Sequence, residues 1–256
     1  MIPLCLVLNL DGEDARLAHF ADQAAHAGVK FERISAVDAR VMPASALAQA
    51  IDPWAIYPLA PSDVGCLLSH RRAWERIVQS HMPWGTIFED DACLSPQTGD
   101  LIDALPFDLV APTIIKLETY GDRQVALGKR RISFAGRSLQ KLRGLAIGTA
   151  GYALNRNACL LLLDQKPCYA LPPDLYLFSR RYGAFKNATV FVMNPAPVIQ
   201  ADRLDEKKSL FVSSYSQRGK QMRPRLPMSR LARREIYRVF EQFAAIGSIR
   251  TVVPWS

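Results

Sequence analysis

The N-terminal part of the chain alternates between short apolar runs and a segment with helical spacing of apolar residues. Residues 2–10 and 31–37 are rich in β-formers, and residues 14–28 place apolar side chains along one side of a helix. Two strands joined through a helix usually run parallel in one sheet. The order strand–helix–strand therefore predicts an α/β fold with a mostly parallel central sheet.

The rest of the chain continues this pattern as far as residue 200. The predicted elements are helices at 62–80 and 155–165, strands at 85–88, 109–117, 145–154 and 189–200, and a hairpin or mobile loop at 124–138. The strand at 189–200 is the last one that we expect.

The positive charge of the chain is confined to its C-terminal end. The formal net charge is +8, and residues 203–256 hold 12 Lys and Arg against 4 Asp and Glu, so residues 1–202 are neutral overall. This split predicts a folded domain at 1–202 and a basic extension at 203–256. The neutral body carries no charge signal for nucleic-acid binding.

The cysteines and the N-terminus indicate a cytoplasmic protein. The five cysteines are dispersed without a Cys-x-x-Cys pair, which favours a reducing compartment. The apolar start ends at Asp11 and lacks the basic region of a signal peptide. No apolar stretch approaches the roughly 20 residues that span a bilayer.

Three adjacent acids, Glu89, Asp90 and Asp91, follow the strand at 85–88. Their carboxylates repel each other, and a semi-buried strand end is a costly place for them without a cation. Oxygen ligands suit Mg²⁺ or Mn²⁺, which often bind substrate phosphates as well. The alternative is a solvated acidic turn, but the apolar strand before the triplet favours a metal site.

Motifs along residues 1–202 occur in the order found in one enzyme family. They are Val7–Asp11, Phe31–Arg33, Ala36–Asp38, Val64–His70, Ile87–Ala92, Ile115–Thr119, Gly148–Tyr152, Pro173–Asp174 and Pro197–Gln200. On these motifs the chain resembles the family 25 glycosyltransferases, the bacterial lipooligosaccharide galactosyl- and glucosyltransferases.

The resemblance implies a GT-A-type nucleotide-sugar-binding fold and a UDP-galactose or UDP-glucose donor, with Mn²⁺ preferred. It implies that Asp91 and Glu89 bind the metal and that Asp90 reaches the ribose. The expected acceptor is a lipid-linked glycan such as lipooligosaccharide.

The implied reaction is an inverting transfer, in which a carboxylate must deprotonate the acceptor hydroxyl. Asp174 matches the family's acidic position and is our first candidate for this base. An N-cap of a helix beginning at Leu175 is the competing interpretation of Asp174. Glu118, at the end of another predicted strand, is the rival candidate.

Six further residues are candidates for contacts with the donor. His70 is one, although a lone helical histidine is often structural, and no Gly-x-Ser-x-Gly motif surrounds it. The small residues around Gly148 would let a ligand approach the backbone closely, or would form a tight turn. The remaining candidates are Asn9, Arg16, Lys116 and Thr149.

The chain departs from the usual pattern at two places. Gly12 follows Asp11 where the family commonly has an arginine, and no histidine after His81 could serve as a metal ligand. We expect any third protein ligand to be Gln200 or Asp202.

The basic extension contains apolar residues at helical spacing between Met228 and Ile246, with arginines largely on other sides. Such a helix suits an anionic inner-membrane surface, or it packs its apolar stripe on the body. Two other functions stay open: a non-catalytic nucleotide-sugar-binding or glycan-binding relative, and a peripheral membrane protein led by its tail.

Overall fold

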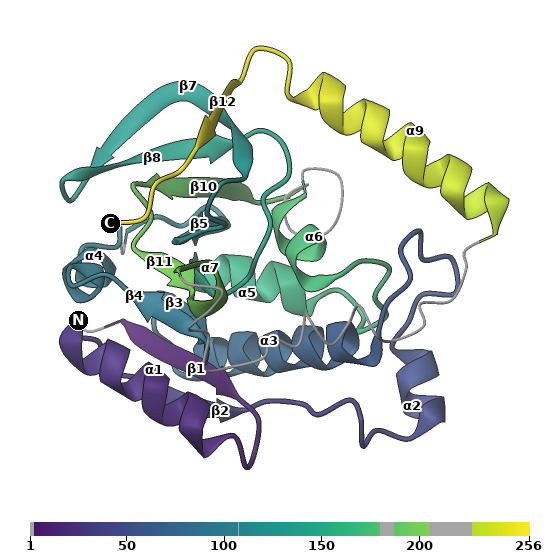
Figure 1. Cartoon of the computed structure of the whole chain (residues 1–256), viewed down its shortest axis with the longest axis horizontal. Helices are drawn as coiled ribbons and strands as arrows, with labels where there is room; N and C mark the ends of the chain where they lie inside the picture. Colours follow the sequence, from purple (N-terminus) through teal and green to yellow (C-terminus); the bar gives the residue numbers. More distant parts are fainter. Residues whose placement is uncertain (1–2, 107, 180–186, 205–226) are drawn as a thin grey trace.

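A mixed sheet of nine strands runs through the centre of the protein (Figure 1). The computed structural model describes residues 3–106, 108–179, 187–204 and 227–256. Within these residues the strand order is β12-β7-β8-β10-β5-β9-β3-β1-β2. The strands are β1 (Leu4–Asn9), β2 (Glu32–Ser35), β3 (Trp84–Glu89), β5 (Thr113–Lys116), β7 (Gln124–Phe134), β8 (Arg137–Leu142), β9 (Gly151–Asn155), β10 (Thr189–Asn194) and β12 (Ile249–Val252).

A smaller sheet and several helices complete the described structure. The smaller sheet has the order β4-β11-β6, with β4 at Ala92–Leu94, β11 at Val198–Gln200 and β6 at Glu118–Thr119. The helices are α1 (Asp14–His26), α2 (Ala44–Gln49), α3 (Pro61–Gln79), α4 (Thr98–Asp103), α5 (Arg156–Leu163), α6 (Pro173–Phe178), α7 (Ala201–Leu204) and α9 (Met228–Ala244). Among the described helices, none is both long and apolar enough to cross a bilayer.

The α/β class is confirmed, but the prediction of a mostly parallel sheet is wrong. β1 runs parallel to β2 and β3, and β5 runs parallel to β10. β9 lies antiparallel between β3 and β5, and β7 and β8 form an antiparallel hairpin. Ala135 and Gly136 at the hairpin turn both have positive φ, the conformation of a two-residue turn. The strand–helix–strand pattern of the N-terminus therefore does not extend to these later strands.

Helices cover both faces of the middle of the central sheet, which explains why strands such as β1 and β3 are nearly continuously apolar. Along β1, Leu6 and Leu8 face a core formed with α3, α5 and α6. The alternate residues Cys5 and Val7 face a second core formed with α1 and α4. The sheet is thus the middle of three layers, and the carboxyl ends of β1 and β3 meet at one edge.

The C-terminal end of the chain returns to the central sheet. β12 pairs antiparallel with β7, and the Thr119 hydroxyl donates a hydrogen bond to the carbonyl of the buried Val253. The expectation that the strand at 189–200 is the last one is therefore wrong. The domain boundary at residue 202 stays a prediction, and residues 205–226 of the basic extension lie outside the described residues.

Helix α3 packs closely on the segment after β2. A Cβ atom at Gly65 would lie 2.6 Å from the Val37 carbonyl oxygen and 3.2 Å from the Ala39 Cβ. The Val37 amide donates a 2.8 Å hydrogen bond to the Ser69 hydroxyl one turn further along α3. The Ser69 hydroxyl therefore has a structural role in holding the segment after β2. This role agrees with the absence of a Gly-x-Ser-x-Gly hydrolase motif around it.

We expect Gly65→Ala to destabilise the protein, although alanine favours helices more than glycine does. Helix propensity alone would stabilise the mutant by about 1 kcal/mol. Forcing a methyl group against a backbone carbonyl typically costs about 1–3 kcal/mol or more, so the net change should be unfavourable. Denaturant unfolding measures the difference.

The matched control is Gly128→Ala in β7, where the nearest atom to the added Cβ would be 3.5 Å away. This control should unfold within about 0.5 kcal/mol of wild type, because the added methyl group would meet its neighbours at ordinary van der Waals distance. A Gly65→Ala protein as stable as wild type would contradict the close packing of α3.

Candidate active site

The acidic triplet lies where the carboxyl ends of β1 and β3 meet. Leu8 of β1 is in register with Glu89 of β3, so Asn9 and Asp90 leave their strands side by side. The Asn9 side-chain amide donates a 2.9 Å hydrogen bond to Asp90 Oδ2, and Asn9 Oδ1 accepts one from Arg33 Nε. The neighbouring strands β1 and β3 therefore fix Asn9 and Asp90 relative to each other.

Arg16 of α1 binds two of the three acids. Its Nε donates to Asp90 Oδ1 at 2.8 Å, its Nη2 contacts the same oxygen, and Nη2 lies 3.3 Å from Asp91 Oδ2. Although burial opposes its charge, the hydrogen bond to Asp90 and the two carboxylates raise the pKa of the Arg16 guanidinium. Both Asp90 oxygens thus accept hydrogen bonds from protein donors. Asp90 could make the predicted contact with the ribose only if one of these donors moved away.

Asp91 is the most poorly compensated acid of the triplet. It is buried, and its Oδ1 has no hydrogen-bond partner within the described residues. Burial, followed by the charge of Glu89, raises the pKa of Asp91 to about 7, and Arg16 offsets this only partly. A buried carboxylate oxygen without a partner is costly, and a bound cation would remove that cost.

The predicted third ligands lie beside Asp91. The Ala201 amide donates a 2.9 Å hydrogen bond to the Asp91 carbonyl, which places the start of α7 against the triplet. Asp202 contributes to the raised pKa of Asp91, and its Oδ1 likewise has no hydrogen-bond partner in the described structure. Gln200 pairs with Ala92 between β11 and β4. The carboxylate oxygens gathered here suit a hard divalent cation such as Mn²⁺ or Mg²⁺.

Three side chains surround the Oε1 atom of Glu89. The Thr149 hydroxyl donates a hydrogen bond to it, the Cys66 sulfur lies 4.0 Å away, and His70 Nε2 lies 3.6 Å away. His70 is fully buried, and its Nε2 has no hydrogen-bond partner within the described residues. The structure thus brings two predicted donor-site residues, His70 and Thr149, to the first acid of the triplet.

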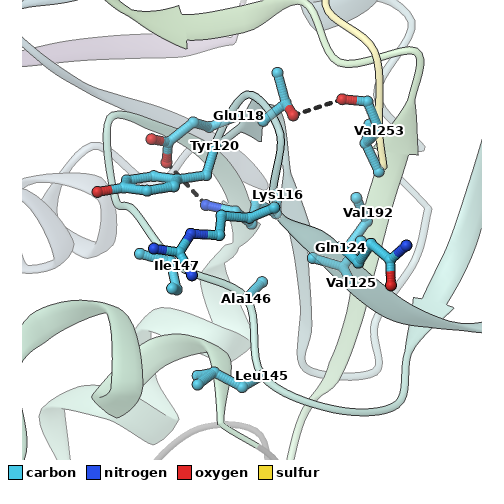
Figure 2. A pocket seen from close by; sticks show the side chains of 12 residues that line it. Lys116, Glu118, Tyr120, Gln124, Val125, Leu145, Ala146, Ile147, Val192 and Val253 are labelled. Carbon is cyan, nitrogen blue, oxygen red and sulfur yellow. Dashed lines mark hydrogen bonds and ion pairs between the residues drawn. The ribbon is translucent and has the colours of Figure 1, made fainter. Parts of the chain in front are cut away.

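A buried ion pair supports the loop that carries Thr149. Lys116 Nζ donates hydrogen bonds to Glu118 Oε2 at 2.8 Å and to the Gly148 carbonyl at 2.6 Å, as Figure 2 shows for the Lys116–Glu118 contact. The Ala150 amide donates to the same Glu118 oxygen at 3.0 Å. Burial raises the pKa of Glu118 to about 7, with Lys116 opposing the shift.

The loop requires glycine at position 148. Gly148 has a φ of +86°, and a Cβ there would lie 2.2 Å from Glu118 Oε1. The Glu118 side chain is 0% exposed and is closed off by this loop. In this structure Glu118 and Lys116 therefore position the loop, and both side chains are buried.

A cavity of about 250 Å³ lies next to this ion pair (Figure 2). Its walls come from the ends of β5 and β6, the start of β7, residues 145–147, β10 and the residue after β12. The lining residues are Lys116, Glu118, Thr119, Tyr120, Arg123, Gln124, Val125, Leu145, Ala146, Ile147, Val192 and Val253. Arg203 stacks on the Tyr120 ring at 4.2 Å and donates a hydrogen bond to its hydroxyl.

Asp174 lies in the first turn of α6, whose N-cap is Pro172. The alternative interpretation of Asp174 as an N-cap is therefore wrong. Its Oδ1 accepts a 2.8 Å hydrogen bond from the Leu175 amide. At the other end of this short helix, the Phe178 ring lies 4.5 Å from Lys116 Nζ. One helical turn thus separates Asp174 from the residue that contacts the ion pair.

Sequence reasoning missed several residues of the site. Tyr152 and Cys66 lie inside the quoted motifs, but nothing in the pattern indicated that Tyr152 bonds to His70 or that Cys66 reaches Glu89. Trp74, which donates a hydrogen bond to Tyr152, looked like an ordinary apolar residue of α3. These contacts join positions far apart in the chain, so local spacing does not predict them.

Comparison with known proteins identifies the family of the chain. The sequence profile of glycosyltransferase family 25 (LPS biosynthesis protein) matches residues 3–177, and the chain therefore belongs to this family of glycosyltransferases.

Two relatives illustrate the match. The lacto-N-neotetraose biosynthesis glycosyltransferase LgtE of Neisseria gonorrhoeae is 25% identical over 94% of this chain and 88% of its own length. LgtB of Neisseria meningitidis serogroup B is 28% identical over 74% of this chain and 72% of its own. Among solved structures, the inositol-1-phosphate CTP transferase of T. maritima superposes with a TM-score of 0.46 at 8% identity, covering 84% of this chain and 94% of its own.

We expect Asp91→Asn to stabilise the metal-free protein at neutral and alkaline pH. The folded-state pKa of Asp91 is about 7 against an ordinary value of 3.8, so the fold favours its protonated form. Protonated Asp91 makes its full contribution to the stability of the fold below about pH 4, and this contribution is lost as the pH rises to about 7. The advantage of the asparagine variant should therefore grow over this range and then level off.

Calorimetric melting in the presence of a chelator, at several pH values, measures this difference. A gain of about 2–4 °C is expected for each kcal/mol recovered in a domain of this size. The exposed Asp164→Asn is the control and should show no such rise with pH. An Asp91→Asn protein that melts lower than wild type at about pH 8 would contradict the buried-charge argument.

Proposed function

We propose that the protein is an inverting, metal-dependent hexosyltransferase with a GT-A-type fold. It transfers galactose or glucose from a UDP-sugar to a lipooligosaccharide or related glycan. The observation that carries this proposal is the acid cluster at the ends of β1 and β3 in a family 25 chain. Within the described residues, Asp91 Oδ1 is buried without a hydrogen-bond partner, and Asp202 Oδ1 is also without one, although Arg203 Nε lies 3.5 Å away.

Glu89 and Asp91 would hold the Mn²⁺ or Mg²⁺ ion, with Asp202 or Gln200 as a third protein ligand. When bound, such an ion neutralises the diphosphate of the donor and stabilises it as the leaving group. Arg16 limits the negative charge of the site before the ion and the nucleotide enter. Asn9, Lys116 and the Gly148–Ala150 loop keep the acids and Thr149 in position for the donor.

The transfer itself requires a base on the acceptor side. Asp174 removes the proton of the acceptor hydroxyl, whose oxygen bonds to the anomeric carbon as the bond from that carbon to the diphosphate oxygen breaks. The first turn of a helix favours a negatively charged carboxylate, which matches this assignment. Glu118 is the weaker candidate because its side chain is closed off by Gly148.

The names of the relatives support the acceptor class. LgtE and LgtB are named for lacto-N-neotetraose biosynthesis, which is the assembly of a glycan. A non-catalytic binding protein is the less favoured alternative, because the chain keeps both the acid cluster and Asp174.

The proposed donor site is tested by melting the protein with UDP-galactose, UDP-glucose and UDP, each with and without Mn²⁺. We expect metal-dependent stabilisation by at least one UDP-sugar, because a ligand that binds only the folded state raises its stability. Asp91→Asn should lose this response. No metal-dependent response to any of the three nucleotides in wild type would overturn the proposed function.

The proposed base is tested in the same experiment with Asp174→Asn. This variant should keep the metal-dependent nucleotide response, while the rate of sugar transfer falls about 100- to 10,000-fold, the usual contribution of a general base. Asp164→Asn is the matched control and should transfer at the wild-type rate. Full transfer by Asp174→Asn would exclude this residue as the base.

A surface of α9 supports a second part of the proposal, contact with an anionic membrane. The apolar side chains of Ile236, Val239 and Phe243 are 55%, 49% and 63% exposed, so they do not pack on the body. Arg233 and Arg238 lie on the same helix. Figure 1 shows α9 at the outer edge of the molecule, away from the central sheet. An apolar stripe with basic flanks suits an anionic bilayer surface, where a lipid-linked acceptor would be presented.

We expect the protein to sediment with vesicles that contain phosphatidylglycerol and not with vesicles of phosphatidylcholine alone. Ile236→Glu combined with Phe243→Glu should weaken this binding at least about 10-fold, since each large apolar side chain contributes about 1.5–3 kcal/mol when buried. The double variant Val41→Glu and Val110→Glu changes two exposed apolar residues outside α9 and serves as control. Equal loss in both double variants would contradict a specific role of α9.

A further inference from the structure

Three buried side chains form a chain of hydrogen bonds that ends at the acid cluster. Trp74 Nε1 donates to the Tyr152 hydroxyl at 2.9 Å, and the Tyr152 hydroxyl lies 2.9 Å from His70 Nδ1. All three residues are fully buried. The other imidazole nitrogen, His70 Nε2, faces Glu89 Oε1 at 3.6 Å.

The first donor of this chain fixes the direction of every later bond. An indole nitrogen only donates, so the Tyr152 oxygen must accept from Trp74. The hydroxyl proton of Tyr152 then has one acceptor in the described structure, His70 Nδ1. A neutral imidazole has one donor and one acceptor nitrogen, so accepting at Nδ1 leaves the proton of His70 on Nε2.

The proton on Nε2 determines what His70 can do. It directs an N–H of His70 toward Glu89 Oε1, 3.6 Å away, the atom that already accepts from Thr149 and lies 4.0 Å from the Cys66 sulfur. Side chains from two segments, helix α3 and the loop that carries Thr149, therefore converge on this one oxygen. Such a convergence fixes the plane of a carboxylate.

We propose that Trp74 and Tyr152 are positioning residues that lock His70 in the tautomer protonated at Nε2. His70 and Thr149 then orient the Glu89 carboxylate so that its other oxygen is turned toward the cation. The orienting role rests on the proposed function of Glu89 as a metal ligand, whereas the tautomer follows from the hydrogen bonds alone. In many metal sites, residues behind the ligands fix the orientation of the ligands in this way.

The same geometry permits one competing arrangement. The ligand atoms of Cys66, His70 and Glu89 lie within 4.8 Å of one another, a spacing that a thiophilic metal ion could bridge. That ion would need the lone pair of Nε2, which the locked tautomer covers with a proton. The tautomer of His70 therefore decides whether its Nε2 can donate a hydrogen bond or bind a metal ion.

Nitrogen-15 NMR of the imidazole at about pH 8, where an ordinary histidine is neutral, measures the tautomer directly. We expect the wild-type His70 signal to show the proton on Nε2. In Trp74→Phe the Tyr152 hydroxyl is able to accept as well as donate, so a mixture of both tautomers is expected. A wild-type His70 protonated on Nδ1, or unaffected by the Trp74 substitution, would overturn the lock.

Two substitutions of His70 test the orienting role. The side-chain amide of His70→Gln can place an N–H near the position of Nε2, whereas that of His70→Asn reaches only the position of Nδ1. We expect the affinity for Mn²⁺ in the presence of UDP to fall a few-fold in the glutamine variant. It should fall about 10- to 100-fold in the asparagine variant, as is typical when support behind a metal ligand is lost.

Equal losses in the two variants would overturn the orienting role. If the wild-type protein binds no Mn²⁺ by electron paramagnetic resonance, the proposed function fails instead, and the NMR result on the tautomer stands by itself. A Co²⁺ titration tests the competing arrangement. A sulfur-to-cobalt charge-transfer band that disappears in Cys66→Ser would overturn the locked tautomer in favour of a thiophilic metal site.

Discussion

The repulsion among three adjacent carboxylates, two of them buried and one partly buried, is the constraint around which the site is organised. β3 delivers Glu89, Asp90 and Asp91 to a place where one arginine, Arg16, supplies compensating charge. Protein donors satisfy the acids unequally. Asp90 is bound at both oxygens, Glu89 Oε1 accepts from Thr149, and Asp91 Oδ1 has no hydrogen-bond partner among the described residues. The remaining negative charge is thus concentrated near Asp91, where a cation would be held most strongly.

The Lys116–Glu118 ion pair shows how the fold keeps this arrangement rigid. A buried ion pair recovers its desolvation cost only when further hydrogen bonds satisfy both groups. Here the extra partners, the Gly148 carbonyl for Lys116 and the Ala150 amide for Glu118 Oε2, belong to the loop that presents Thr149 to Glu89. Glu118 Oε1 has no hydrogen-bond partner in the described structure. The pair therefore contributes little net stability but fixes the loop, and the absence of a side chain at Gly148 is what lets the loop close over Glu118.

The sequence predicted the parts of the site that depend on local patterns. The apolar strand before the triplet and the parallel β1 and β3 follow from spacing along the chain, and they place Asn9 beside the acids. The antiparallel insertion of β9 and the return of β12 depend on contacts between distant segments, which no local period encodes. For the same reason the bonding of Asp90 to Arg16, and of Tyr152 to His70 across 82 positions, could not be predicted.

The return of β12 to the sheet also connects helix α9, the proposed membrane contact, with the cavity beside the Lys116–Glu118 ion pair. β12 begins five residues after α9 ends, so the helix cannot lie more than about 18 Å from the sheet edge along the chain. Val253, the next residue after β12, lines the cavity beside the ion pair and accepts a hydrogen bond from Thr119. A helix held on a membrane would therefore be joined through one short strand to the wall of the cavity. This connection would restrain the orientation in which the body meets a lipid-linked acceptor.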